Sequence, residues 1–117
     1  MGYTTDFNGF LEFNRKLTQE ELETYDKFKE QKHEDSYKPS IWLQWEVSVG
    51  TSVDYLEWDG VEKFYNHIEW LEYIIKYIFK VWGLVLNGKI RWIGEELCDM
   101  GIIEVKDNQV LARYYKD

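Results

Sequence analysis

The stretch from Val61 to Trp82, VEKFYNHIEWLEYIIKYIFKVW, decides the fold that this sequence predicts. Its apolar residues alternate at spacings of three and four, which places them on one face of an α-helix: Val61, Phe64, Ile68, Leu71, Ile75, Ile78 and Trp82. Lys76 and Lys80 lie roughly opposite, so the segment is amphipathic and its charges exclude a membrane span. We expect one long helix, with Asp59 as its N-cap and Gly83 as its C-terminal stop.

On the N-terminal side, residues 3–14 alternate between apolar and polar, which predicts one long β-strand. An alternative uses Asn8-Gly9 as a hairpin turn, since this dipeptide accepts positive φ at both positions. We prefer the single strand, with Gly9 as a bulge or a close-packing site, because the alternation continues through it.

Between these two segments, residues 17–33 predict a second helix. It opens with a capping box, in which Thr18 and Glu21 exchange hydrogen bonds between side chain and main chain. Residues 41–49 and 53–58 again alternate, and they predict an antiparallel hairpin.

The C-terminal part predicts two further hairpins. Asn87-Gly88 lies between two apolar runs and is the strongest short turn signal in the chain. Asp107-Asn108 lies between two more runs and predicts a second tight turn.

Together these elements predict an α+β fold in a single domain, residues 1–117. The order is β-α-β-β-α-β with two or three extra strands. It matches the split βαβ (ferredoxin-like) arrangement, in which two helices pack on one face of an antiparallel sheet, here with extra C-terminal β-hairpins.

Composition narrows the functional classes. The 117 residues carry a formal charge of -8, which disfavours direct nucleic-acid binding and leaves a protein partner open. No signal peptide or membrane span is visible, so we expect a cytoplasmic protein. Cys98 is the single cysteine, and it predicts neither a disulfide nor a zinc site.

No residue pattern predicts catalysis, a cofactor or a metal site. His33 and His67 are the only histidines, and no nucleophile-base pair with a recognisable spacing accompanies them. Two groups of acidic residues stand out. The first is Asp54, Glu57, Asp59 and Glu62, and the second is Glu95, Glu96 and Asp99. We interpret both as solvated or partner-facing, since neither has the ligand pattern of an EF-hand loop.

The long helix carries a second apolar strip, displaced from the first: Trp70, Ile74, Tyr77 and Val81. One interpretation is that the C-terminal hairpins cover it; the other is an exposed aromatic patch for a partner. The residues that we expect to bind a partner are therefore Asp54, Glu57, Asp59, Trp70, Tyr77, Glu95, Glu96 and Asp99.

Several motifs resemble a family of small bacteriophage- and prophage-encoded proteins with no established activity. They are Gly2-Tyr3-Thr4-Thr5-Asp6-Phe7, Glu57-Trp58-Asp59-Gly60, Glu62-Lys63-Phe64-Tyr65-Asn66, Glu69-Trp70-Leu71-Glu72-Tyr73, Leu86-Asn87-Gly88, Gly94-Glu95-Glu96 and Val105-Lys106-Asp107-Asn108. The resemblance covers nearly the whole chain and departs from the family between the first helix and Trp42. It implies a phage or prophage protein that acts in the bacterial cytoplasm.

The leading hypothesis is therefore a non-enzymatic binding protein that engages a host or defence protein through acidic and aromatic surface. One alternative is a small-molecule or nucleotide-binding domain, because the many aromatic residues can line a pocket. Another is a divalent-metal-dependent enzyme that uses the acidic groups. Self-association is left open.

Overall fold

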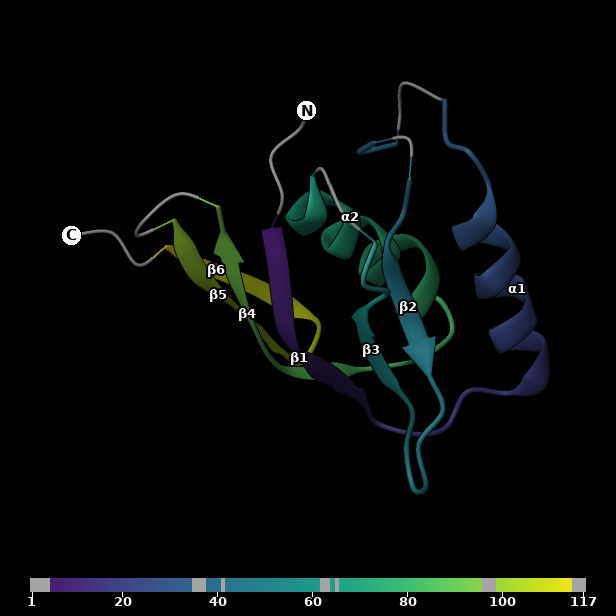
Figure 1. The fold of residues 1–117 in the computed structure, drawn as a ribbon. Coiled ribbons are helices and arrows are strands. Elements are labelled where there is room, and N and C mark those ends of the chain that lie inside the picture. Colours follow the sequence, from purple (N-terminus) through teal and green to yellow (C-terminus); the bar gives the residue numbers. More distant parts are fainter. Residues whose placement is uncertain are drawn as a thin grey trace.

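The computed structural model describes residues 5–34, 38–40, 42–61, 64, 66–95 and 99–114. The elements are β1 (Thr5–Phe13), α1 (Gln19–Glu30), β2 (Trp45–Ser48), β3 (Tyr55–Trp58), α2 (His67–Ile74), the π-helix η1 (Ile75–Phe79), β4 (Leu86–Gly94), β5 (Met100–Lys106) and β6 (Gln109–Tyr114). The described strands form one sheet in the order β2-β3-β1-β4-β5-β6, and every neighbouring pair is antiparallel. The predicted α+β class is confirmed. Figure 1 shows α2 behind the sheet and α1 alongside β2.

One face of the sheet is buried and the other is open. Along β1, Phe7, Leu11 and Phe13 are buried, whereas Phe10 and Glu12 between them are exposed. The same alternation places Leu56, Leu86, Ile90 and Ile103 of the neighbouring strands, all 0% exposed, on the buried face. Each fully buried side chain of this size contributes about 1.5–3 kcal/mol of transfer free energy, so this face and the helices over it form the core.

The prediction that β1 is continuous is confirmed, and the hairpin alternative at Asn8-Gly9 is wrong. Gly9 lies mid-strand with φ of +111°, and a Cβ atom there would lie 2.8 Å from the carbonyl oxygen of Lys89. The glycine therefore permits close approach of the β4 backbone, which L side chains would prevent.

The hairpin predicted at Asn87-Gly88 is wrong. β4 runs straight through this dipeptide and pairs with β1 from Leu86 to Gly94. Gly88 has φ of +146°, and a Cβ there would lie 2.8 Å from the carbonyl oxygen of Phe10, so the two strands approach closely at both glycines. Long-range pairing with β1 therefore overrides the local turn preference.

The turn predicted at Asp107-Asn108 is confirmed. Asp107 has φ of 49° and Asn108 has φ of 70°, as the tight turn between β5 and β6 requires. Asn87 is part of its support, because its side-chain oxygen accepts a hydrogen bond from the amide of Asp107 at 2.9 Å.

The predicted long helix starts later than expected. α2 begins at His67, its N-cap is Asn66 with φ of 55°, and Val61 is 55% exposed. Asp59 is therefore not the N-cap. Its carboxylate accepts a hydrogen bond from the amide of Val61 and pairs with Lys29 at 2.9 Å. The described residues between Asp59 and His67 are not helical.

The last turn of this helix is a π-helix. The amide of Lys80 bonds the carbonyl of Ile75 five residues earlier, at 2.9 Å. The wider turn brings Phe79 into the core at 0% exposed and leaves Ile78 half-buried, which a regular 3.6-residue period does not predict. Gly83, with φ of +75°, follows as the predicted stop.

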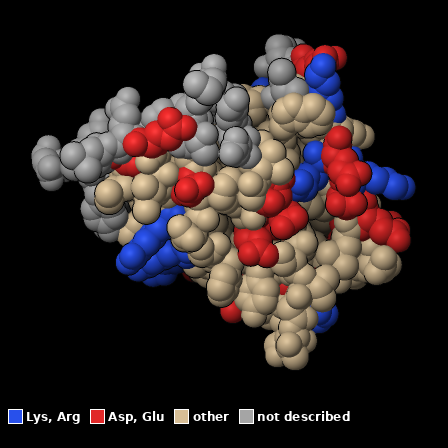
Figure 2. Space-filling model, viewed as in Figure 1, with Lys and Arg blue, Asp and Glu red and all other residues tan. Residues whose placement is uncertain are grey.

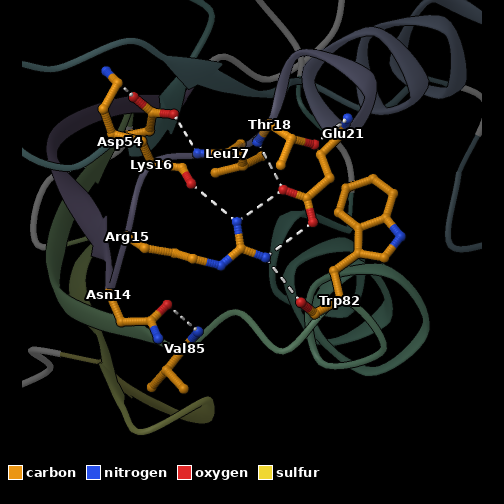
Figure 3. Close-up of polar contacts among 9 residues, drawn as sticks. All are labelled: Asn14, Arg15, Lys16, Leu17, Thr18, Glu21, Asp54, Trp82 and Val85. Atoms are coloured by element: carbon orange, nitrogen blue, oxygen red, sulfur yellow. Dashed lines mark hydrogen bonds and ion pairs between the residues drawn. The ribbon is translucent and has the colours of Figure 1, made fainter.

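The connection from β1 into α1 is held by polar contacts (Figure 3). The predicted capping box is present, since Thr18 and Glu21 exchange both hydrogen bonds. The Arg15 guanidinium makes two 2.9 Å bonds to the Glu21 carboxylate and a third to the carbonyl of Trp82. This pairing with Arg15 lowers the pKa of Glu21. Through Arg15 the start of α1 is also tied to the turn that follows η1.

Candidate functional site

The first predicted acidic group is built into the fold. Asp54 is 0% exposed, and its carboxylate accepts hydrogen bonds from the amides of Leu17 at 2.8 Å and Gly50 at 3.1 Å. Lys16 adds an ion pair at 3.1 Å. Burial alone would raise the pKa of Asp54, but these hydrogen bonds and Lys16 together lower it. Asp54 therefore stabilises two loops, and the expectation that it lies on a partner-facing surface is wrong.

The neighbouring acids also have partners within the chain. Glu57 accepts a hydrogen bond from the hydroxyl of Ser48 on the adjacent strand. The Asp59 side chain is only 10% exposed and pairs with Lys29. Glu62 lies outside the described residues, so the described members do not form the solvated patch that the sequence predicts.

The second acidic group follows the end of β4. Glu95 is exposed, Asp99 is half-buried, and Glu96 lies outside the described residues. The carbonyl of Asp99 accepts a hydrogen bond from the amide of Gly94 at 2.7 Å, which closes this loop. In the described part of the chain, no three His, Cys, Asp or Glu side chains form a group that could hold a metal ion.

The second apolar strip of the long helix is divided. Trp70 is 0% exposed and its indole nitrogen donates to the hydroxyl of Ser40 at 2.6 Å. The rings of Phe28 and His33 pack against it from α1 and the segment after α1, so at Trp70 the cover comes from these residues and not from the C-terminal hairpins. Tyr77, by contrast, is 55% exposed.

Tyr77 lies in a groove between α1 and the α2–η1 helix. This interhelical groove has a volume of about 250 Å³ and is lined by Thr24, Tyr25, Phe28, Tyr73, Tyr77, Ile78 and Trp82. The rings of Phe28 and Tyr73 stack across it with centroids 6.3 Å apart, and the rings of Tyr73 and Tyr77 lie 4.8 Å apart. The sequence placed Trp82 on the apolar face of the long helix but did not indicate that this end of the helix lies against Phe28 of α1.

Lysines border the interhelical groove in this otherwise acidic protein. The Lys76 ammonium lies 5.1 Å from the centre of the Tyr77 ring, and the Lys38 ammonium lies 5.7 Å from that of Tyr73. Both distances are within the range of cation–π attraction. The groove therefore combines aromatic surface with a positive rim.

A second cavity, of about 300 Å³, lies between α1 and β2. Its lining is Gln19, Leu22, Glu23, Tyr25, Asp26, Lys29, Glu46, Val47 and Val49. Burial raises the pKa of Glu46, and nearby Asp59 and Glu57 act in the same direction against the opposing effect of Lys29. The cavity is acidic and suits a cationic group, although its one lysine is already paired with Asp59.

Both histidines are half-buried or buried among aromatic rings. The His67 ring lies 4.9 Å from Phe7 and 5.9 Å from Trp92, and burial lowers the pKa of His67. His33 lies 2.9 Å from the carbonyl of Phe28 through Nε2, and burial likewise lowers its pKa. These positions are those of packing residues.

Comparison of the chain with protein-family models, with curated proteins and with solved structures gave no match. Among the described helices, none has the length and apolarity needed to cross a membrane.

Proposed function

We propose that this chain is a non-enzymatic binding protein that receives an apolar side chain of a partner protein in the interhelical groove. The observation that carries the proposal is the groove itself, with its aromatic lining and a Tyr77 ring that is 55% exposed. Tyrosine and tryptophan dominate the energetics of protein interfaces because they bury large area at low entropic cost.

The dimensions of the groove favour a protein partner over a small molecule. Its volume of about 250 Å³ lies below the roughly 300–1,000 Å³ of typical small-molecule pockets. A single inserted side chain from a larger surface suits this size, with flanking contacts to α1 and η1.

In this proposal the partner is a host or defence protein in the bacterial cytoplasm, and the chain is of phage or prophage origin. The origin rests on the resemblance of the motifs described above. The formal charge of -8 keeps a small binding protein soluble and steers it toward basic surface on a partner, while lysines border the groove itself.

We also propose that the elements from β1 to β4 form a split βαβ core to which β5 and β6 are appended. The strand order β2-β3-β1-β4, with antiparallel neighbours, supports this assignment. In such a core both helices share one sheet face, which is the arrangement that creates a groove between them.

The proposal is tested by capture from bacterial lysate on immobilised protein, followed by affinity measurement on the captured partner. We expect Tyr77→Ala to weaken binding about tenfold or more, the usual cost of removing an interface anchor. Val81→Ala is the matched control, because Val81 is 72% exposed in the turn after η1 but does not line the groove. Equal affinities for Tyr77→Ala and wild type would refute the proposal.

A further inference from the structure

The open face of the sheet carries large apolar side chains that the helices do not cover. They come from four strands, with exposed fractions in parentheses: Phe10 (51%), Ile93 (49%), Met100 (37%) and Leu111 (47%). Ile93 is the direct cross-strand neighbour of Met100, and Leu111 is opposite Glu104. Ile93 and Met100 are therefore adjacent. Lys89 and Glu104 lie between Phe10 and Leu111 in the register, so the face combines exposed apolar side chains with charged ones.

The charges on this open face separate by sign across the sheet. On β1, the side chains of Asp6 and Glu12 lie on the open face with Phe10, because every second residue of a strand points to the same face. On the β4 side, Lys89 and Arg91 point outward as the direct neighbours of Phe10 and Asn8. Figure 2 shows a basic group at the lower left with acidic atoms above it, and acidic atoms in the centre and on the right, where further basic atoms also lie.

The neighbouring strands continue this separation. Glu57 of β3 extends the acidic half, and Lys106 of β5 extends the basic half, where Glu104 is the exception. Among the described residues, Asp6, Glu12, Lys89 and Arg91 form no ion pair within 4 Å. Each half therefore offers charges that an opposing surface of the other sign can neutralise.

We propose that the open sheet face binds the same face of a second copy of this chain. A two-fold axis that runs parallel to the strands turns one copy over and brings its acidic half onto the basic half of the other. An axis across the strands would place like charges together, so the charge pattern selects the first geometry. Phe10, on a strand beside the midline of the sheet, then packs near its own counterpart.

The size of the face is sufficient for a dimer. The six strands have 4–9 residues each and lie about 4.8 Å apart, so they cover on the order of 600 Å². This is at the lower end of the roughly 600–1,000 Å² per partner of a standard stable interface. Two sheets packed in this way lie about 10 Å apart, with their side chains interleaved.

Charge reversal tests the proposal by sedimentation equilibrium of purified protein. Wild type is expected to dimerise, and both Lys89→Glu/Arg91→Glu and Asp6→Lys/Glu12→Lys are expected to weaken the dimer about tenfold or more. An equimolar mixture of the two variants should form a heterodimer, because the acidic face of one variant then lies against the basic face of the other. Circular dichroism checks that each variant is folded, and Lys76→Glu/Lys80→Glu on the helices is the matched control.

A monomeric wild type at millimolar concentration would overturn the proposal, as would variants that stay dimeric alone or fail to associate when mixed. Cross-linking tests the axis separately. In a Cys98→Ser background, Ile93→Cys near one end of β4 should be joined to its counterpart by a bis-maleimide of about 10 Å span, because an axis parallel to the strands keeps these two strand ends together. An axis across the strands would place them at opposite ends of the interface, and Val81→Cys should not cross-link in either case. Loss of partner binding in Tyr77→Ala leaves this result unchanged, since the groove lies on the helical side of the molecule.

Discussion

Two pairs of residues with similar turn chemistry behave differently in this protein. Asn87-Gly88 lies inside β4, whereas Asp107-Asn108 forms the tight turn between β5 and β6. Both dipeptides accept positive φ, so local preference does not separate them. The difference lies in the neighbouring strand. β1 pairs with β4 over nine residue pairs and needs a side-chain-free position at Gly88, whereas Asp107-Asn108 lies outside the paired strand residues and is held by hydrogen bonds with Leu86 and Asn87.

The largest effect is expected when the close approach of β1 and β4 is broken. Gly88→Ala places a Cβ 2.8 Å from the Phe10 carbonyl and forces an L residue to φ of +146°. We expect a loss of about 3 kcal/mol in the free energy of unfolding, measured in urea. Gly60→Ala is the control, since φ is +84° there but no atom lies within 4 Å, and it should cost only about 1 kcal/mol.

A second test addresses the buried anchor at Asp54. Asp54→Asn leaves the amide of Leu17 or Gly50 without a charged acceptor, and we expect a loss of about 2 kcal/mol at pH 7. Because the folded-state pKa of Asp54 is lowered, its contribution is complete above the unfolded-state value of about 4 and is lost as pH falls below it. Wild type should therefore lose more stability than Asp54→Asn between pH 5 and pH 2. If the free energies of unfolding of wild type and Asp54→Asn fell equally between pH 5 and pH 2, this role of Asp54 would be contradicted.

A third test breaks the turn rather than the strands. The Asn108 side chain accepts from the amide of Leu86 at 2.7 Å and donates to the carbonyl of Leu84 at 2.9 Å. Asn108→Ala removes both bonds and places alanine at φ of 70°, so thermal unfolding should report a loss of about 1–2 kcal/mol. An unchanged melting temperature would mean that this turn does not depend on its asparagine.

The smallest expected effect is a gain in stability rather than a loss, and it concerns the turn between β5 and β6. Asp107→Gly puts glycine where φ is 49°, outside the paired strand residues, and keeps the main-chain bond to Asn87, so we expect a gain of up to about 0.5 kcal/mol. Glycine would thus be tolerated at the turn, while at position 88 it is required. A loss larger than 1 kcal/mol in urea unfolding would indicate that the Asp107 carboxylate has a structural role.

In the candidate site too, the local sequence pattern did not predict which side chains are buried, because burial depends on contacts between distant parts of the chain. Helical periodicity predicted an apolar strip containing Trp70 and Tyr77 but could not assign one to the core and the other to the interhelical groove. That assignment depends on where α1 packs and on the π-helical turn, which changes the faces of the residues after Ile74. The acidic patch prediction failed at Asp54 because a carboxylate in a loop is usually solvated, and only the tertiary structure brings the Leu17 amide to it.

By itself, the sequence determined the features that depend on a few adjacent residues. These are the alternation of β1, the capping box of α1 and the turn at Asp107-Asn108, each set by sterics and hydrogen bonds within about four positions. Tertiary structure alone decided the straight passage through Asn87-Gly88, the π-turn, the burial of Asp54 and the groove. Local preferences are worth about 1 kcal/mol or less per residue, so burial and pairing between residues far apart in the chain outweigh them.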